Sequence, residues 1–467
     1  MRILFASSEV APFAKTGGLA DVAEGLPRAL SKIGCNLTVI LPFYRSVKKS
    51  KLPLDKFSAG EYNFLRYKKG NIGYVFVDKD EYYDRDSLYC EMQSGDYADN
   101  EFRFSYFDKA VVEFAAQAMP PLDIIHLNDW QTGLVPIYLR LTKNPVKTLF
   151  TIHNIGYQGL FSRGALGALG IPRIFYNRKG MEHYGKISFL KAGLAYSSAI
   201  NTVSTGYMRE ILTSRFGCGM ERILKSRLPH VYGILNGVDY KDWDPSSDKY
   251  IRARYDCDSL EKKHECKTDL IERTGLPVET AARPIIGVIS RLAEQKGIDL
   301  IAASAGSLVN MGASIVILGI GDRKYNRLCE KMASDYPGYI SVHIKFDDEF
   351  AHMIEAGSDM ILIPSRYEPC GLNQFYSMRY GTLPVVRATG GLDDTVSDIF
   401  ENYRSGNGIK FQDATKTGLE EAVRRAISLY NDREKWQDVQ KRIMKLDFSW
   451  DKSALRYKEL YQKLVGS

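Results

Sequence analysis

The chain has 467 residues, 45% of them hydrophobic and 25% charged, which is typical of a globular protein with two or three domains. Its net charge of +7 is modest and no long basic run occurs, so nucleic-acid binding is not indicated, whereas an anionic small substrate is compatible. The seven cysteines include no C-x-x-C pair, and neither a signal peptide nor a membrane-length apolar run is evident. We therefore expect a reduced, cytoplasmic protein that does not bind membranes.

Strand-like and helix-like segments alternate along the whole chain. Apolar, β-branched runs predict strands at Ile3–Ser7, Leu37–Leu41, Asp123–His126, Thr148–Ile152 and Ala199–Val203 in the first half. After a polar turn cluster at Trp243–Asp248, they predict strands at Pro284–Ser290, Ser314–Gly319, Tyr339–His343, Met360–Ile363 and Leu383–Val386. Helical stretches between them, such as Leu19–Ile33, predict βαβ units and an α/β fold with two doubly wound parallel sheets.

The turn cluster and the last apolar pattern set the expected domain limits. We expect an N-terminal domain over 1–242, a C-terminal domain over 243–445, and a terminal segment 446–467 whose helix, Trp450–Val465, returns to the first domain. Ligands of doubly wound sheets bind at the carboxyl ends of the strands. Functional residues should therefore lie in loops that follow strands, on either side of a cleft between the two domains.

The segment Lys15–Asp21 follows the first predicted strand and precedes the first helix. Gly17 and Gly18 permit close approach of backbone amides, the helix directs its positive end to the same point, and Lys15 adds a cation. Asp21 lies on the first helical turn. The segment matches neither of the best-known phosphate motifs, and a simple turn with a solvated lysine is an equally good local interpretation.

Three loops of the second half carry similar chemistry. Arg291 and Lys296 follow a strand and suit a diphosphate, although surface cations of an ordinary loop would look the same. Glu368 lies in a rigid turn after another strand, where it can bind sugar hydroxyls, oppose a developing cation, or simply favour a helix N-terminus. The turn Thr389–Gly391 offers further amides to phosphate.

Polar clusters follow neighbouring strands of the first half. His126, Asn128 and Asp129 end one predicted strand, and His153 and Asn154 end the next. A lone histidine is more often structural, but two polar clusters at adjacent strand ends indicate a site. The histidines lack metal-ligand spacing and no carboxylate cluster joins them, so no bound metal is predicted.

A further turn lies at Asn236 and Gly237. It is explained best as structural, with room for a ligand contact.

Taken together, these motifs resemble one family over essentially the whole chain. Lys15–Asp21, His153-Asn154, Leu235–Gly237, Ser290-Arg291 with Lys296-Gly297, Pro364–Leu372 and Arg379–Pro384 occur in the order found in the ADP-glucose-using glycogen and starch synthases, family 5 of the glycosyltransferases. Each motif alone is weak, and jointly they are specific.

The resemblance implies a GT-B fold and a retaining, metal-independent transfer of glucose from ADP-glucose to the non-reducing end of an α-1,4-glucan, with no cofactor. It implies catalytic roles for Glu368, His153, Lys15, Arg291 and Lys296. The implied donor contacts are Lys15, Gly17, Gly18, Asp21, Arg291, Lys296, Phe346, Tyr367, Glu368, Cys370, Gly371, Thr389, Gly390 and Gly391. The implied sugar and acceptor contacts are Asp129, His153, Asn154 and Asn236. Oligomeric state is left open.

Three positions depart from patterns seen in related enzymes. Tyr376 stands where many other retaining GT-B enzymes have a second glutamate, which favours the family named above because it commonly lacks that residue. Phe346 replaces a tyrosine expected to stack on the nucleobase, and Gln131 replaces a frequent histidine. The acceptor side is therefore the least constrained part of the prediction.

Other functions remain open at this stage. A dinucleotide-dependent oxidoreductase is disfavoured because the glycine-rich Leu318–Asp322 lacks the third glycine of G-x-G-x-x-G. A non-catalytic nucleotide-sugar or glucan-binding protein would not need Glu368. The nearest alternative is a related transferase that uses UDP-glucose or makes another α-glucan.

Overall fold

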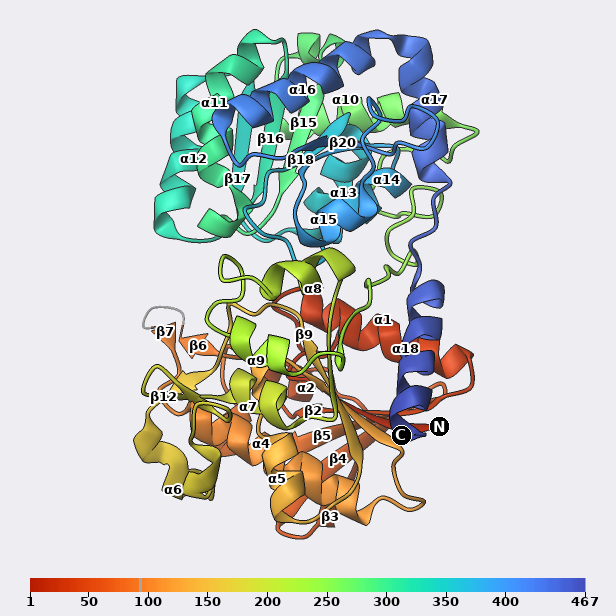
Figure 1. The fold of residues 1–467 in the computed structure, drawn as a ribbon. Coiled ribbons are helices and arrows are strands. Elements are labelled where there is room, and N and C mark those ends of the chain that lie inside the picture. Colours follow the sequence, from red (N-terminus) through yellow and green to blue (C-terminus); the bar gives the residue numbers. More distant parts are fainter. Residues whose placement is uncertain (92–94, 467) are drawn as a thin grey trace. The chain divides into compact units, whose positions relative to one another are not determined.

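The computed structural model describes residues 1–91 and 95–466 and divides the chain into two compact units. Unit 1 comprises Met1–Gly237 and the C-terminal segment that begins at Trp450, and unit 2 comprises Val238–Ser449. Each unit is an α/β structure with its own sheet (Figure 1).

In the described part of unit 1, nine strands form one sheet. Across the sheet the order is β14 (Val231–Gly233), β13 (Ala199–Thr202), β9 (Lys147–Ile152), β8 (Ile124–Asn128), β1 (Arg2–Ala6), β2 (Asn36–Pro42), β5 (Ile72–Asp78), β4 (Tyr62–Lys69) and β3 (Asp55–Ala59). The strands from β14 to β5 are parallel, and β4 and β3 extend the sheet as an antiparallel edge. The carboxyl ends of β1, β8 and β9 therefore lie side by side.

Helices and two small sheets complete unit 1. Its longer helices are α1 (Gly18–Lys32), α4 (Asn100–Gln117), α5 (Val135–Leu141), α7 (Phe189–Tyr196), α8 (Thr205–Ile211) and α18 (Trp450–Val465). The shorter ones are α2 (Arg45–Lys49), α3 (Asp80–Tyr83), α6 (Leu166–Leu169) and α9 (Glu221–Ser226). Strands β10 (Leu160–Phe161), β12 (Lys186–Ser188) and β11 (Glu182–His183) pair antiparallel, as do β6 (Cys90–Glu91) and β7 (Gly95–Asp96).

The described part of unit 2 has a six-stranded, fully parallel sheet. Its order is β17 (Ile340–Ile344), β16 (Ser314–Gly319), β15 (Ile285–Ile289), β18 (Met360–Ile363), β19 (Leu383–Arg387) and β20 (Ile409–Phe411). Its helices are α10 (Lys263–Thr274), α11 (Ile298–Asn310), α12 (Arg323–Asp335), α13 (Asp348–Gly357), α14 (Asn373–Arg379), α15 (Gly390–Thr395), α16 (Lys416–Asn431) and α17 (Arg433–Met444).

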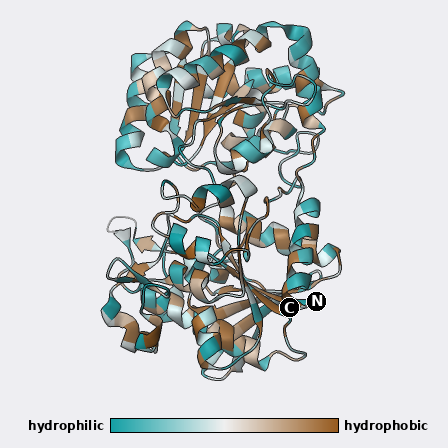
Figure 2. Cartoon of the chain, viewed as in Figure 1, coloured by the Kyte–Doolittle hydropathy of each residue, from teal (hydrophilic) through white to brown (hydrophobic). Residues whose placement is uncertain are grey.

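The sheet of unit 2 is buried on both faces. Along β16, Ile315 and Ile317 enter one hydrophobic cluster with α11, α12 and α16, whereas Val316 and Leu318 enter a second cluster with α10 and α13. This alternation follows from the two-residue period of a strand. Figure 2 shows the strands as mainly hydrophobic. The doubly wound arrangement predicted for this half is thus confirmed.

The C-terminal helix α18 packs on unit 1 beside α1 (Figure 1). The Trp450 indole lies against Gly25, where a Cβ atom would overlap the ring, so glycine permits this close approach. Lys458 Nζ donates to the Ile33 carbonyl at 2.7 Å, and Ser453 Oγ donates to the Leu235 carbonyl at 2.5 Å. Aromatic and polar contacts both fix the helix.

Each strand predicted from the sequence is present with ends within two residues of those expected. The sequence pattern did not indicate β3 and β4, which form the antiparallel edge of the unit 1 sheet, nor β5, β14 and β20, which pair parallel within the two main sheets. Within the described residues, no helix is both long enough and apolar enough to cross a membrane.

Candidate functional site

The loop between β1 and α1 is held by a buried carboxylate. Glu9, which is 4% exposed, accepts hydrogen bonds from the Thr16 amide at 2.6 Å, the Thr16 hydroxyl at 2.7 Å and the Gly17 amide at 3.2 Å. The Tyr89 hydroxyl donates to the same carboxylate at 2.8 Å. Because four donors converge on one anion, Glu9 fixes the conformation of the predicted phosphate loop.

Lys15 and Asp21 form an ion pair of 2.8 Å at the start of α1, with both side chains more than a third exposed. The Gly17 amide is directed to Glu9, whereas the exposed Gly18 amide has no acceptor among the described residues. The Gly18 amide is therefore left open at the positive end of the helix, beside the exposed ion pair of Lys15 and Asp21.

The ends of β8 and β9 bring Asp129 and His153 together. Asp129 has a left-handed backbone, with φ of 56°, and its Oδ1 accepts the His153 amide at 2.8 Å. A non-glycine residue in this region is uncommon and costs conformational energy. The strain is offset here by the hydrogen bond, which links two adjacent strand ends.

Burial shifts both side chains toward their neutral forms. It raises the pKa of Asp129 to about 7, with the negative charge of Glu9 adding a smaller contribution, and it lowers the pKa of His153 to about 3. The Asn128 amide nitrogen donates to the Ala6 carbonyl at 2.9 Å, so its oxygen accepts from His153 Nε2 at 2.9 Å. His153 is thus a neutral imidazole with its proton on Nε2.

The other predicted residues of unit 1 lie in turns near these strands. Asn154 accepts the Gly156 amide at 3.0 Å. Asn236 is 5% exposed and its side-chain oxygen has no partner among the described residues, as is also true of Gln131. A buried amide oxygen without a donor is costly, so these two atoms are positioned to accept hydrogen bonds.

In unit 2 the loops after β15 and β18 meet through an ion pair. Lys296 Nζ lies 2.5 Å from Glu368 Oε2, and Ser365 Oγ donates to the same oxygen at 2.8 Å. Glu368 is only 6% exposed. Because β15 and β18 are neighbours in the sheet, residues 72 positions apart in sequence form one charged centre.

Gln295 connects the same two loops. Its side chain accepts from Arg291 Nη2 at 3.1 Å and donates to the Tyr367 carbonyl at 3.1 Å. Its own carbonyl accepts the Arg366 amide at 2.7 Å. Arg291 is thereby held next to the loop that carries Tyr367 and Glu368.

The loop after β19 packs tightly on this centre. The Gly391 amide donates to the Glu368 carbonyl at 3.0 Å, and a Cβ on Gly391 would overlap the Cys370 carbonyl. Gly390 has φ of 48° and Gly371 has φ of 74°, so both adopt left-handed conformations that favour glycine. The glycines of this loop therefore allow three strand ends to approach one another.

Two aromatic residues of unit 2, Phe346 and Tyr376, occupy positions that the sequence comparison with related enzymes singled out. Phe346, which follows β17, is 78% exposed and so has a ring face accessible for stacking. Tyr376, at the position of the second glutamate of other enzymes, stacks on Trp243 with ring centroids 4.3 Å apart. That position therefore serves packing in this chain.

The predicted site residues thus fall into two groups, one in each unit. The unit 1 group contains Lys15, Gly17, Gly18, Asp21, Asp129, His153, Asn154 and Asn236. The unit 2 group contains Arg291, Lys296, Phe346, Tyr367, Glu368, Cys370, Gly371, Thr389, Gly390 and Gly391.

Sequence reasoning missed Glu9, Tyr89 and Gln295, whose contacts support these groups. Glu9 could have been found as an acidic residue at a strand end. Tyr89 carried no such signal. In the described segments, no three His, Cys, Asp or Glu side chains gather as a metal site requires.

Comparison with known proteins gives consistent matches over the full chain. The model of the starch synthase catalytic domain matches residues 2–226, and that of glycosyl transferases group 1 matches residues 277–442. Glycogen synthases of Koribacter versatilis and Syntrophotalea carbinolica are each 43% identical, covering 99% and 100% of this chain and 98% and 99% of theirs.

Two solved structures also match this chain over its full length. The catalytic domain of starch synthase IV from Arabidopsis thaliana, bound to ADP and acarbose, superposes with a TM-score of 0.89 at 31% identity, covering 100% of this chain and 99% of that one. Sucrose-phosphate synthase from Thermosynechococcus elongatus, at 18% identity, a TM-score of 0.64 and coverage of 100% and 99%, shares the fold.

Proposed function

The chain belongs to the glycogen and starch synthase family of glycosyltransferases, with the GT-B fold, and we propose that it transfers glucose from ADP-glucose to the non-reducing end of an α-1,4-glucan. Glucan elongation from a nucleotide sugar follows from the family. ADP-glucose as donor, retention at the anomeric carbon, independence of metal and a cytoplasmic location are our proposals.

The observation that carries the proposal is the centre formed by Lys296 and Glu368. A buried carboxylate held by a lysine and a serine hydroxyl is suited to lie beside a sugar that gains positive charge in the transition state. The lysine adds a cation for the departing diphosphate. Gln295 accepts a hydrogen bond from Arg291, which supplies a second cation beside the same loop.

We assign the donor diphosphate to Arg291 and Lys296, with Lys15 and the Gly18 amide contributing from unit 1. In this assignment, side-chain cations and backbone amides stabilise the charge that develops on the leaving group. Removing one such preorganised donor costs on the order of 10²–10³ in rate. Phe346 would stack on the nucleobase with its exposed ring.

Asp129, His153 and Asn236 are assigned to the sugar and acceptor. Neutral His153 has Nδ1 as an acceptor for a hydroxyl proton, because its Nε2 proton is donated to Asn128. Asn236 presents its unpartnered amide oxygen to another hydroxyl. These groups would orient the sugar for attack on the face from which the diphosphate departs, with a phosphate oxygen taking the acceptor proton. A covalent glucosyl adduct trapped on Glu368 would overturn this same-face mechanism.

The proposal is tested by incorporation of labelled glucose into glycogen from ADP-glucose and UDP-glucose in parallel. We expect incorporation from ADP-glucose and its loss in Glu368→Ala, with Glu401→Gln, an exposed glutamate, as the matched control. Preference for UDP-glucose would show that UDP-glucose is the donor in place of ADP-glucose. No incorporation from either donor would refute the proposal.

A chelator should leave the activity unchanged. Loss of activity that a divalent ion restores would contradict the metal-independent mechanism.

A further inference from the structure

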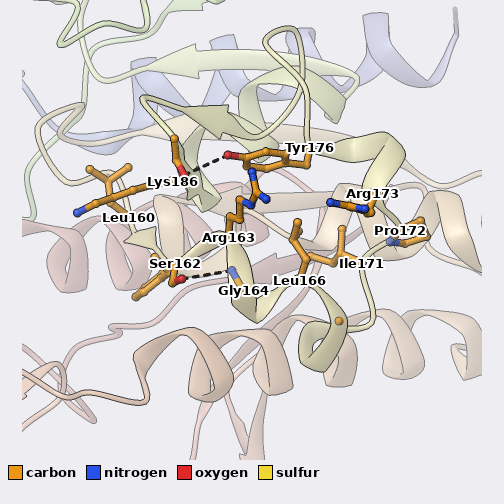
Figure 3. Close-up of a pocket in the computed structure, with 13 residues that line it drawn as sticks. Leu160, Ser162, Arg163, Gly164, Leu166, Ile171, Pro172, Arg173, Tyr176 and Lys186 are labelled. Carbon is orange, nitrogen blue, oxygen red and sulfur yellow. Dashed lines mark hydrogen bonds between the residues drawn. The ribbon is translucent and has the colours of Figure 1, made fainter.

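A hollow of about 1030 Å³ lies within unit 1 and uses none of the residues of the candidate site. Its lining comes from one continuous stretch, residues 160–186, which runs from β10 through α6 to the first residue of β12 (Figure 3). The volume is at the upper end of the range of pockets for small molecules, roughly 300–1,000 Å³.

The lining is positively charged and has no compensating acid. Arg163, Arg173 and Lys186 line the hollow, and no lining residue is acidic. None of these three cations forms an ion pair with any residue in the described part of the chain.

Residues 160–186 contain five lysines and arginines against one glutamate, so more than half of the chain's net charge of +7 falls within 27 residues. The one acid, Glu182, accepts the Gly185 amide at 2.9 Å.

The walls are fixed by internal hydrogen bonds. The Tyr176 hydroxyl donates to the Gly185 carbonyl at 3.0 Å, which holds the ring in place. The Ile171 amide donates to the Leu166 carbonyl at 3.0 Å, and both of these side chains are buried. Figure 3 shows Arg163 and Arg173 reaching into the space beside the Tyr176 ring. Exposed cations thus adjoin an apolar and aromatic wall whose backbone and tyrosine are held by hydrogen bonds.

We propose that this hollow binds a small phosphate monoester. Arg163 and Arg173 would each offer a guanidinium fork to the phosphate oxygens, since arginine binds phosphate in bidentate geometry. Tyr176, Leu166 and Ile171 would contact the organic part of the ligand. A neutral glucan would leave the clustered cations without a counter-charge, and it is therefore a poorer match than a phosphate ester.

Phenyl phosphate and inorganic phosphate are the probes, titrated calorimetrically at constant ionic strength, with phenol as the uncharged control. We expect saturable binding of phenyl phosphate, weakened at least roughly tenfold in the double variant R163Q/R173Q because charge-assisted hydrogen bonds are lost. Tighter binding of phenyl phosphate than of inorganic phosphate would show that the apolar wall contributes.

The matched control is R178Q/K179Q, which removes two cations from the same stretch without altering the lining. It should bind phenyl phosphate as the unmodified chain does, and circular dichroism should show both variants folded. Equal weakening in both variants would indicate general charge attraction and overturn the proposal. Absence of saturable binding at millimolar phenyl phosphate, or binding of maltoheptaose that R163Q/R173Q abolishes while phosphate binding persists, would also overturn it.

Discussion

Replacing the buried carboxylate that holds the loop between β1 and α1 should impair both stability and turnover. In Glu9→Gln the side chain keeps its shape and loses its charge. The amides of Thr16 and Gly17, which donate at 2.6 and 3.2 Å, would then bond to a neutral acceptor. The hydroxyl donors can reverse their direction toward an amide NH₂, whereas the backbone amides cannot.

The magnitude follows from these two amides. Hydrogen bonds to a charged group contribute about 1.5–3 kcal/mol and neutral ones about 0.5–1.5, so losing the charge costs about 1 kcal/mol per amide and about 2 in total. For a unit of this size we expect Tm to fall by about 4–8 °C. If the loop must be ordered mainly in the transition state, kcat falls by up to about 30-fold, with a smaller change in the KM for the donor.

A second readout separates positioning from simple destabilisation. The negative charge of Glu9 contributes to raising the pKa of Asp129, so Glu9→Gln should lower that pKa toward its ordinary value. This shift is measurable by NMR titration of the Asp129 carboxyl. Glu401→Gln, at an exposed turn of unit 2, is the control and should leave Tm, kcat and the Asp129 titration unchanged. A Glu9→Gln enzyme with unaltered Tm, kcat and Asp129 titration would refute the reasoning.

Three further outcomes are expected. Lys15→Ala should reduce kcat by about 10²-fold or more in the glucose-transfer assay, while the unit 2 cations partly retain donor binding. Loss of donor affinity with normal turnover of bound donor would contradict this. Gly25→Ala should lower Tm, because overlap with the Trp450 indole costs about 1–3 kcal/mol and outweighs the gain of about 1 kcal/mol in helix propensity. The control, Gly167→Ala, has open space at its Cβ and should not lower Tm. Urea titrations should show that the free energy of unfolding falls between about pH 6.5 and 5 relative to that of His126→Gln. Burial lowers the pKa of His126 well below its usual value, so at this residue the unfolded chain binds the extra proton. Parallel pH profiles of the two proteins would contradict this.

The strands and the residues of the unit 2 group could be predicted because their signals are local. Each apolar run and each motif after it lies within about ten residues, and the parallel βαβ pattern places successive carboxyl ends at one sheet edge. Lys296 and Glu368 were both identified from such loops, although their ion pair depends on β15 and β18 being neighbours. Glu9 was missed because its partners, Thr16, Gly17 and Tyr89, show no spacing that a motif would reveal.

His126 shows why a polar residue at a strand end can either support the fold or belong to a ligand site. The sequence grouped it with Asp129, three residues later. In the structure its Nδ1 lies 2.7 Å from the Tyr461 hydroxyl, and its Nε2 lies 2.6 Å from Thr151 Oγ1. Since Thr151 donates to Asn201, His126 donates from Nε2 and accepts from Tyr461, so a neutral histidine anchors α18 to the sheet. That anchor is 335 positions away in sequence, and only the return of the last helix to unit 1 decides whether this histidine supports the fold or the ligand site.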